Sequence, residues 1–341
     1  MDTKDKILEF HIIHSMKGGC GKTAFSLFKA LDLAQRNIEG GKADVLYIDA
    51  DFKGSALEWL IYESKSVLGE SMEELLKKAE GRTPMKRCQL AFSANYSKKN
   101  LNHYINGACD TLDSILAKGI CYNRIQKAET HGGGEEINLN GYIDFIFASS
   151  NLEDKHCLCY NDVHGHHKMP SLGAGKYTYK MENLIRQIIN YRKNSKKGIG
   201  QYRHIIIDMP PGYDEYADLL LVELRRFAQK EERIKLNYYG VTTNDRGHLH
   251  TLYQNIKTAV SISEQYKTYN SVNVVLNCQS SEDFKEDAEL QNVKKELQDV
   301  VSSEEKMPAI VINEYQEEYR KFCRQKDIHD FTYSFKNISI N

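Results

Sequence analysis

Residues 17–23 read Lys-Gly-Gly-Cys-Gly-Lys-Thr, a set of residue types suited to gripping a phosphate group. Glycines let the backbone curl so that several N–H groups point at one phosphate, a lysine adds positive charge, and a hydroxyl can bind Mg²⁺. Lys22 and Thr23 supply the charge and the hydroxyl, and Lys17 is an additional lysine at the front of the loop. The stretch therefore predicts a phosphate-binding loop.

Such a loop functions only between a strand and a helix, where the phosphate lies at the positive N-terminal end of the helix. Residues 7–14 (ILEFHIIH) are apolar and β-branched, which predicts a buried strand. Residues 22–36 carry an apolar stripe at helical spacing, which predicts the helix. The predicted strand, loop and helix therefore follow one another in the order that a phosphate-binding loop requires.

Two further apolar strands end in carboxylates. Residues 45–51 (VLYIDAD) end in Asp49 and Asp51, and residues 204–211 (HIIIDMPP) carry Asp208 after three isoleucines. Asp208 would be costly to bury without a cation nearby. Asp49 lies two residues before Asp51 and so on the same side of its strand, where it can either support a metal ion or cap a turn.

These three motifs, in this order, resemble the deviant Walker A ATPases of the ParA/MinD family, which belong to the SIMIBI class of P-loop NTPases. In that family the loop reads KGGxGK followed by Ser or Thr, and residues 17–23 fit it at every position. Residues 142–150, 237–244, 272–277 and 307–312 resemble the other core strands of the family. Residues 55–140 and 151–175 do not align with it.

The resemblance implies ATP and Mg²⁺ as cofactors. The backbone N–H groups of residues 19–23 would surround the β-phosphate, Lys22 would neutralise the β- and γ-phosphates, and Thr23 would bind Mg²⁺. Asp51 would orient the attacking water, and Asp208 would hold Mg²⁺ through its water shell. The implied nucleotide-binding set is Lys17, Gly18, Gly19, Cys20, Gly21, Lys22, Thr23, Ala24 and Asn277.

Lys17 carries the most specific implication. In the resembled family this front lysine reaches across a nucleotide-bound homodimer to the phosphates of the partner, so hydrolysis requires pairing. Cys20, in the middle of the loop, is expected to be small filler, although a thiol near a helix N-terminus can also be reactive.

The nucleobase of the bound nucleotide is predicted partly from a missing motif. The sequence has no Asn-Lys-x-Asp run of the kind that reads guanine in related GTPases, and Asn277 ends a strand where the family often places an adenine contact. This favours ATP, although Asn277 equally suits a plain turn.

Strands alternate with helical stretches along the rest of the chain, which predicts an α/β fold with a doubly wound, mainly parallel sheet. We expect one P-loop ATPase domain over residues 1–341, interrupted by a helical insertion over 55–140. The expected later helices are 214–230, 248–266, 283–301 and 314–326. Within the insertion, helical spacing relates Leu101, Tyr104, Ile105, Ala108, Leu112, Ile115 and Leu116.

Composition limits the partners and the compartment. The net charge of −1 excludes a global field that draws the chain to DNA or anionic lipid. No apolar run approaches the ~20 residues that span a bilayer, and the N-terminus lacks a signal pattern, so we expect a cytoplasmic protein without stable membrane anchoring. The eight cysteines then favour reduced thiols.

Two features are less specific. The loop 151–175 could bind a metal ion, but its spacing is not a standard ligand pair and a plain loop is the simpler interpretation; its candidate ligands are His156, Cys157, Cys159, His164, His166 and His167. Basic residues could form patches for nonspecific DNA or simply a solvated helix face; they are Lys196, Lys197, Arg320, Lys321, Arg324 and Lys326.

The favoured hypothesis is a ParA-like dimerising switch that binds and slowly hydrolyses ATP and so controls binding to a partner protein or to DNA. One alternative is a regulatory or defence-associated ATP-binding module with little turnover. Another is a metal-cluster carrier on the same fold.

Overall fold

The structure is a computed structural model, and it describes residues 7–36, 45–53, 57, 99–127, 136–149, 171–191, 193–195, 198–200, 202–243, 246–266, 268–279, 288, 292, 295, 309–314 and 337–340.

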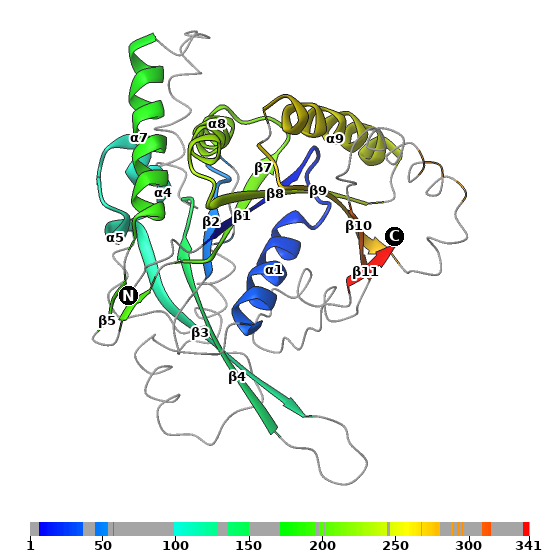
Figure 1. The fold of residues 1–341 in the computed structure, drawn as a ribbon, viewed down its shortest axis with the longest axis horizontal. Coiled ribbons are helices and arrows are strands. Elements are labelled where there is room, and N and C mark those ends of the chain that lie inside the picture. The colour runs from blue at the N-terminus through cyan, green and yellow to red at the C-terminus, as the bar shows by residue number, and fades with distance from the viewer. Residues whose placement is uncertain are drawn as a thin grey trace.

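A nine-stranded sheet with the order β11-β10-β9-β8-β1-β7-β2-β4-β3 forms the centre of the molecule (Figure 1). The strands β1, β2, β4, β7, β8, β9 and β10 run parallel, and the two edge strands β3 and β11 run antiparallel to their neighbours. Their bounds are β1 Leu8–Ser15, β2 Val45–Asp49, β3 Leu116–Lys127, β4 Glu136–Ile146, β7 His204–Pro211, β8 Ile234–Thr242, β9 Ser271–Gln279, β10 Ala309–Glu314 and β11 Asn337–Ile340. The predicted α/β, doubly wound, mainly parallel fold is confirmed.

One face of the sheet is covered by helix α1 (Lys22–Arg36), which follows β1 through the glycine-rich loop (Figure 1). Phe25 and Leu27 of α1 are buried against Ile13 of β1, Tyr47 of β2 and Ile206 of β7. This packing fixes the first turn of α1 above the end of β1.

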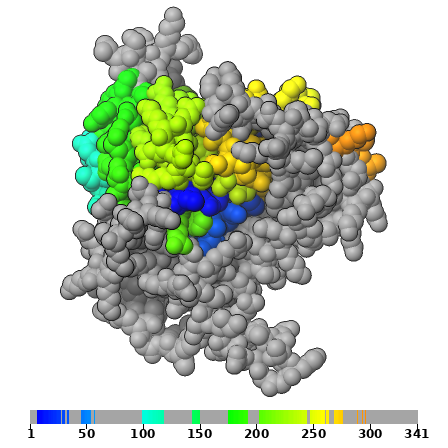
Figure 2. Space-filling model, in the orientation of Figure 1, coloured from blue at the N-terminus to red at the C-terminus, as the bar shows by residue number. Residues whose placement is uncertain are grey.

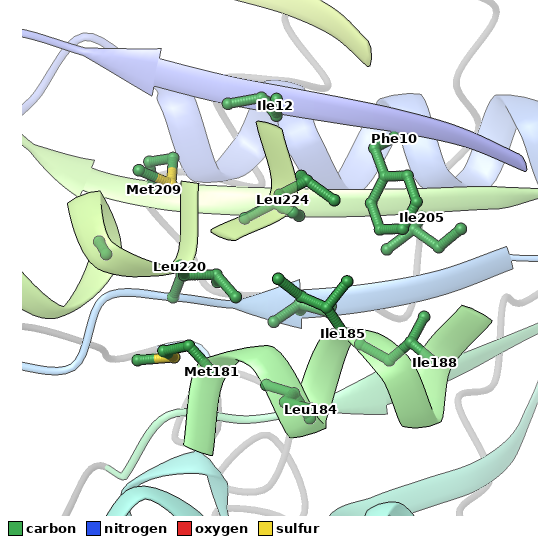
Figure 3. Packing of buried hydrophobic residues seen from close by; sticks show 14 of the residues in the cluster. Phe10, Ile12, Met181, Leu184, Ile185, Ile188, Ile205, Met209, Leu220 and Leu224 are labelled. Carbon is green, nitrogen blue, oxygen red and sulfur yellow. The ribbon is translucent and has the colours of Figure 1, made fainter. Parts of the chain in front are cut away.

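The opposite face is covered by α7 (Ser171–Ile189), α8 (Glu215–Lys230) and α9 (Arg246–Tyr266). Side chains of β1 and β7 interdigitate there with those of α7 and α8; Figure 3 labels Phe10, Ile12, Met181, Leu184, Ile185, Ile188, Ile205, Met209, Leu220 and Leu224. Full burial of one such aliphatic side chain stabilises the fold by roughly 1.5–3 kcal/mol. On the surface, α7 and α8 lie side by side (green and yellow-green in Figure 2).

Gly240 on β8 lets α9 approach the sheet closely. A Cβ atom at this position would lie 2.6 Å from Cδ1 of Leu252 and 2.9 Å from Cδ1 of Ile256, so a larger residue would require these side chains of α9 to move. Helix α8 begins at an N-cap, because the side chain of Asp214 accepts hydrogen bonds from the backbone N–H groups of Tyr216 and Ala217.

The expected helical insertion over residues 55–140 differs from the structure in its second half. Two short helices, α4 (Leu101–Asn106) and α5 (Leu112–Ile115), lie where helical spacing predicted them. Leu116, however, begins strand β3, which pairs with β4 as a long antiparallel hairpin. The helical prediction is therefore wrong for 116–127 and for 136–140, because pairing at the sheet edge overrides local periodicity. Most of 55–98 lies outside the described residues.

Several other segments differ from the predictions or lie partly outside the described residues. Residues 171–175, expected to end the Cys/His loop, belong to α7, whereas 151–170 lie outside the described residues. The expected helix 283–301 is described only at three residues. Of the expected helix 314–326, Glu314 instead ends strand β10, and 315–326 lie outside the described residues. A small hairpin of β5 (Lys193–Ser195) and β6 (Gly198–Gly200), which the sequence did not predict, precedes β7.

Among the residues described, none of the helices has both the length and the apolar character needed to cross a membrane.

Candidate functional site

The glycine-rich loop lies at the carboxyl end of β1, directly before α1. Gly19 has a φ angle of 82° and Gly21 one of 79°, a left-handed conformation that favours glycine. The helix begins at once, because the N–H of Phe25 donates to the carbonyl of Gly21. A Cβ atom built on Gly18 or Gly19 would meet nothing within 4 Å, so the loop presents an open backbone surface.

Lys22 and Asp208 form a buried ion pair at the centre of this site. Nζ of Lys22 lies 2.5 Å from Oδ1 of Asp208 and 3.5 Å from the hydroxyl of Thr23. Burial opposes the charge of the ammonium group, but the neighbouring carboxylates of Asp208, Asp49 and Asp51 outweigh it and raise the pKa of Lys22. The lysine therefore stays protonated beside the two side chains predicted to handle Mg²⁺.

Tyr47 and Ser26 complete the surroundings of Asp208, and neither residue was predicted from the sequence. The Tyr47 hydroxyl donates to Oδ2 of Asp208 at 3.0 Å and lies 2.6 Å from the Ser26 hydroxyl. Burial and the nearby carboxylates raise the pKa of Tyr47 well above its usual value, so the phenol remains a donor. The sequence does contain a signal for Tyr47, because this residue lies two positions before Asp49 and therefore on the same face of β2.

Asp49 and Asp51 lie next to this pair. Asp49 is opposite Asp208 on the neighbouring strand, and its Oδ1 accepts the backbone N–H of Asp51 at 3.1 Å. Asp49 thus caps the turn that follows β2, which was one of its two expected roles, and it also adds negative charge near Lys22. Asp51 is half-buried just beyond the strand.

The two lysines of the loop have opposite environments. Lys22 is buried, whereas Lys17, Gly18 and Gly19 are exposed at the front of the loop. Cys20 is buried, and its thiol donates to the carbonyl of Lys17 at 3.5 Å, which matches the filler role. The loop therefore offers one ammonium group inside the molecule and one on its surface.

His14 supports the loop from the opposite face of the sheet, which the sequence did not predict. Its Nε2 donates to the carbonyl of Gly212 at 2.7 Å, and its Nδ1 lies 2.9 Å from the Tyr238 hydroxyl and 3.3 Å from Nδ2 of Asn255. Asn255 also reaches the sulfur of Met16. Burial lowers the pKa of His14 below its ordinary value, and the charge of Lys22 lowers it further. The hydrogen bond to Gly212 acts in the opposite direction but does not outweigh them. This network ties α9 to the start of the glycine-rich loop at Met16 and to the turn after β7 at Gly212.

The remaining predicted residues are only partly placed. Ala24 is buried in the first turn of α1. Asn277 lies on β9, opposite Asn313 of β10, but its side chain is outside the described part of the structure. The structure thus brings together Lys22, Thr23, Asp49, Asp51 and Asp208.

No family model matches the sequence, and no curated protein matches it. Solved structures do. A protein of Borrelia burgdorferi B31 described as a plasmid partition protein, bound to AMPPNP, aligns with a TM-score of 0.50 and 13% identity over 98% of this chain and 94% of that chain. The structure of pnob8 ParA aligns with a TM-score of 0.45 and 17% identity over 87% of this chain and 78% of that chain.

The loop, the parallel sheet and the buried lysine together define the P-loop NTPase class of folds. Within it, the similarity to the Borrelia protein shows that this chain has the ParA-like α/β fold. At that low identity the likeness shows the fold alone.

Proposed function

We propose that this chain is a ParA-like molecular switch that binds ATP with Mg²⁺, pairs with a second copy and hydrolyses ATP slowly. The observation that supports the proposal most is the buried pair of Lys22 and Asp208 at the start of α1, with exposed Lys17 on the same loop. The likeness of the fold to a protein bound to AMPPNP agrees with a nucleotide triphosphate as the ligand.

The residues fit a triphosphate with its metal ion. The positive φ angles at Gly19 and Gly21 turn the loop around the N-terminal end of α1, where backbone N–H groups favour an anion. Lys22 would exchange part of its contact with Asp208 for phosphate oxygens. Thr23 and Asp208 would then hold Mg²⁺, which neutralises charge that builds up on the phosphates.

Asp51 is the proposed water-positioning residue. It lies half-buried after β2, beyond Asp49, and its backbone is anchored by the Asp49 carboxylate. Because phosphoryl transfer asks for positioned charge more than covalent chemistry, loss of this one carboxylate would slow hydrolysis without loss of binding.

Lys17 is the proposed contact to the second copy. Its exposure lets its ammonium group reach phosphates bound in a partner subunit, in the way an arginine finger acts in trans. Pairing would then change the surface offered to a partner protein or to DNA, and nucleotide hydrolysis would reverse the change.

Dimerisation is tested by size-exclusion chromatography with light scattering at saturating ATP and Mg²⁺. We expect Asp51→Ala to bind ATP and to elute as a dimer, and the Asp51→Ala, Lys17→Ala double variant to bind ATP and elute as a monomer. Lys257→Ala, at an exposed position of α9, serves as the control and should leave the dimer intact. A dimer that persists without Lys17 would overturn the role in trans.

Turnover is tested by phosphate release with and without duplex DNA. We expect slow release from the wild type and a loss of about 100-fold or more in Asp51→Ala, as for other groups that act mainly in the transition state. Normal hydrolysis by Asp51→Ala would show that another group positions the water. If DNA binds, its affinity should fall steeply with salt.

A further inference from the structure

A second cluster of polar side chains lies on the α1 face of the sheet, at the amino end of β1 and β7 and away from the phosphate loop. Glu9 and His11 are two residues apart on β1, so their side chains leave the same face of the sheet. His204 is the first residue of β7 and lies directly opposite Glu9 in the parallel register. Strand pairing therefore brings the three side chains together.

The three facing atoms form a nearly equilateral triangle. Nε2 of His11 lies 3.4 Å from Nδ1 of His204 and 3.6 Å from Oε2 of Glu9, and Nδ1 of His204 lies 3.5 Å from the same oxygen. These separations are long for hydrogen bonds, which are strongest near 2.9 Å. They match the edge of about 3.4 Å that a tetrahedron has when its centre lies about 2.1 Å from each ligand, as in zinc sites.

We propose that Glu9, His11 and His204 form a binding site for a transition-metal ion, with Zn²⁺ as the chemically favoured occupant. Two imidazole nitrogens and one carboxylate oxygen suit Zn²⁺ better than Mg²⁺ or Ca²⁺, which prefer oxygen ligands alone. A water molecule would supply the fourth ligand.

The surroundings of the cluster suit a bound ion. The side chain of His11 is 4% exposed, that of His204 17% and that of Glu9 40%, so the site is buried on one side and open to solvent on the other. Burial, followed by the charge of Lys29 and by His204, lowers the pKa of His11 well below its ordinary value. Nδ1 of His11 lies 3.4 Å from the Tyr239 hydroxyl, the kind of outer contact that orients a ligating histidine.

One neighbour opposes a cation. Lys29 on α1 places its ammonium group 5.4 Å from the centre of the Tyr239 ring, and its charge acts on His11. Lys29 is partly exposed, so solvent screens this repulsion. The opposition gives a specific test, since removal of the Lys29 charge should strengthen metal binding, whereas a purely structural cluster would not respond in this way.

The experiment uses the full chain, stripped with EDTA and titrated with ZnCl₂ by calorimetry, in a background of Cys157→Ser and Cys159→Ser that removes the competing thiolates of another segment. We expect about one Zn²⁺ per chain. Glu9→Gln and His204→Gln, both at partly exposed positions, should each weaken binding by at least about 10-fold. His250→Gln, at an exposed histidine of α9, is the matched control and should change nothing.

Two further readouts separate a ligand role from a structural one. Lys29→Gln should tighten Zn²⁺ binding roughly two- to fivefold, the range expected for a screened charge. Added Zn²⁺ should raise the melting temperature of the parent protein but not that of Glu9→Gln. Absence of Zn²⁺ binding, or binding that Glu9→Gln and His204→Gln leave unchanged, would overturn the proposal. ATP binding should be unaffected in all these variants, so this test is independent of the proposed switch.

Discussion

The α1 face of the strands β1 and β7 carries polar groups at both ends, and the two ends are built differently. At the carboxyl end, Lys22 and Asp208 meet beneath the phosphate loop; at the amino end, Glu9, His11 and His204 meet on the strands themselves. His204 and Asp208 are four residues apart on β7, or about 13 Å. Buried Ile206 lies between them on β7.

The difference follows from the direction of the strands. Parallel strands all end at the same edge of the sheet, so loops gather there and add backbone N–H groups and a helix N-terminus to the side chains. At the amino end, side chains must rely on strand register alone, as the pairing of Glu9 with His204 shows. One end is therefore suited to a large anion and the other to a small ion. Substitutions should therefore be able to disable either end without the other.

Removal of the Lys22 ammonium group should have the largest effect on stability, and it should abolish ligand binding only at the carboxyl end of the strands. Lys22→Met leaves the Asp208 carboxylate buried without a cation, so we expect the free energy of unfolding to fall by about 3–5 kcal/mol, measured by urea denaturation. ATP binding should be lost in calorimetry. Lys22→Met combined with Asp208→Asn should recover much of the stability but no ATP binding. Retained ATP affinity in Lys22→Met would contradict the assigned role of Lys22.

A substitution between the two ends should lower the free energy of unfolding without selectively weakening ligand binding at either end. Ile206 is fully buried between β7 and α1, so Ile206→Ala should lower the free energy of unfolding by about 2–5 kcal/mol and Ile206→Val by about 0.5–1.5 kcal/mol. At temperatures where the variants are folded, calorimetry should give unchanged ATP and Zn²⁺ affinities for Ile206→Val. A selective loss of one ligand would show that the ends are coupled through this position.

Removal of one tyrosine hydroxyl at each end should lower the free energy of unfolding by smaller and unequal amounts. The Tyr47 hydroxyl donates to the buried Asp208 carboxylate at 3.0 Å, whereas the Tyr239 hydroxyl lies 3.4 Å from His11. Because hydrogen bonds to charged groups are the stronger kind, Tyr47→Phe should lower the free energy of unfolding by about 1.5–3 kcal/mol. Tyr239→Phe should lower it by less than about 1 kcal/mol. Equal losses in urea denaturation would remove this distinction between the ends.

The smallest effect is the pH dependence of the support beneath the loop. Burial lowers the pKa of His14 in the folded state, so below about pH 6.5 the unfolded chain takes up a proton there before the folded one does. Stability from this group is therefore complete at neutral pH and is lost as pH falls, by at most about 1.4 kcal/mol per unit. His14→Gln should flatten the difference in unfolding free energy between pH 7 and pH 5.5. An unchanged slope would show that His14 does not titrate on unfolding.

Local patterns predicted much of the molecule. The strands β1, β2, β7, β8 and β9 and the helices α1, α8 and α9 lie close to their expected positions, because buried strands and amphipathic helices leave clear periodic signals. Strand β3 and the first part of β4, residues 136–140, were expected as helix, whereas the rest of β4 overlaps the core strand expected over 142–150. An edge strand is defined by its pairing more than by its own sequence, so local spacing misled the prediction there. Helix α7 was not predicted: its first residues, 171–175, were expected to belong to the Cys/His loop, and no helix was expected over 176–189. Its packing against α8 is a long-range contact.

The sequence by itself determined the phosphate loop, the carboxylates at the ends of β2 and β7, and the parallel α/β fold. Each of these depends on residues close together in the chain, whose spacing encodes turn, strand or helix directly. Only the tertiary structure decided that Tyr47 and Ser26 hold Asp208, that His14 ties α9 to the loop, and that Glu9, His11 and His204 meet. Those groups are brought together by strand register and by the side of the sheet each side chain faces, and no local pattern records which distant strand will lie alongside.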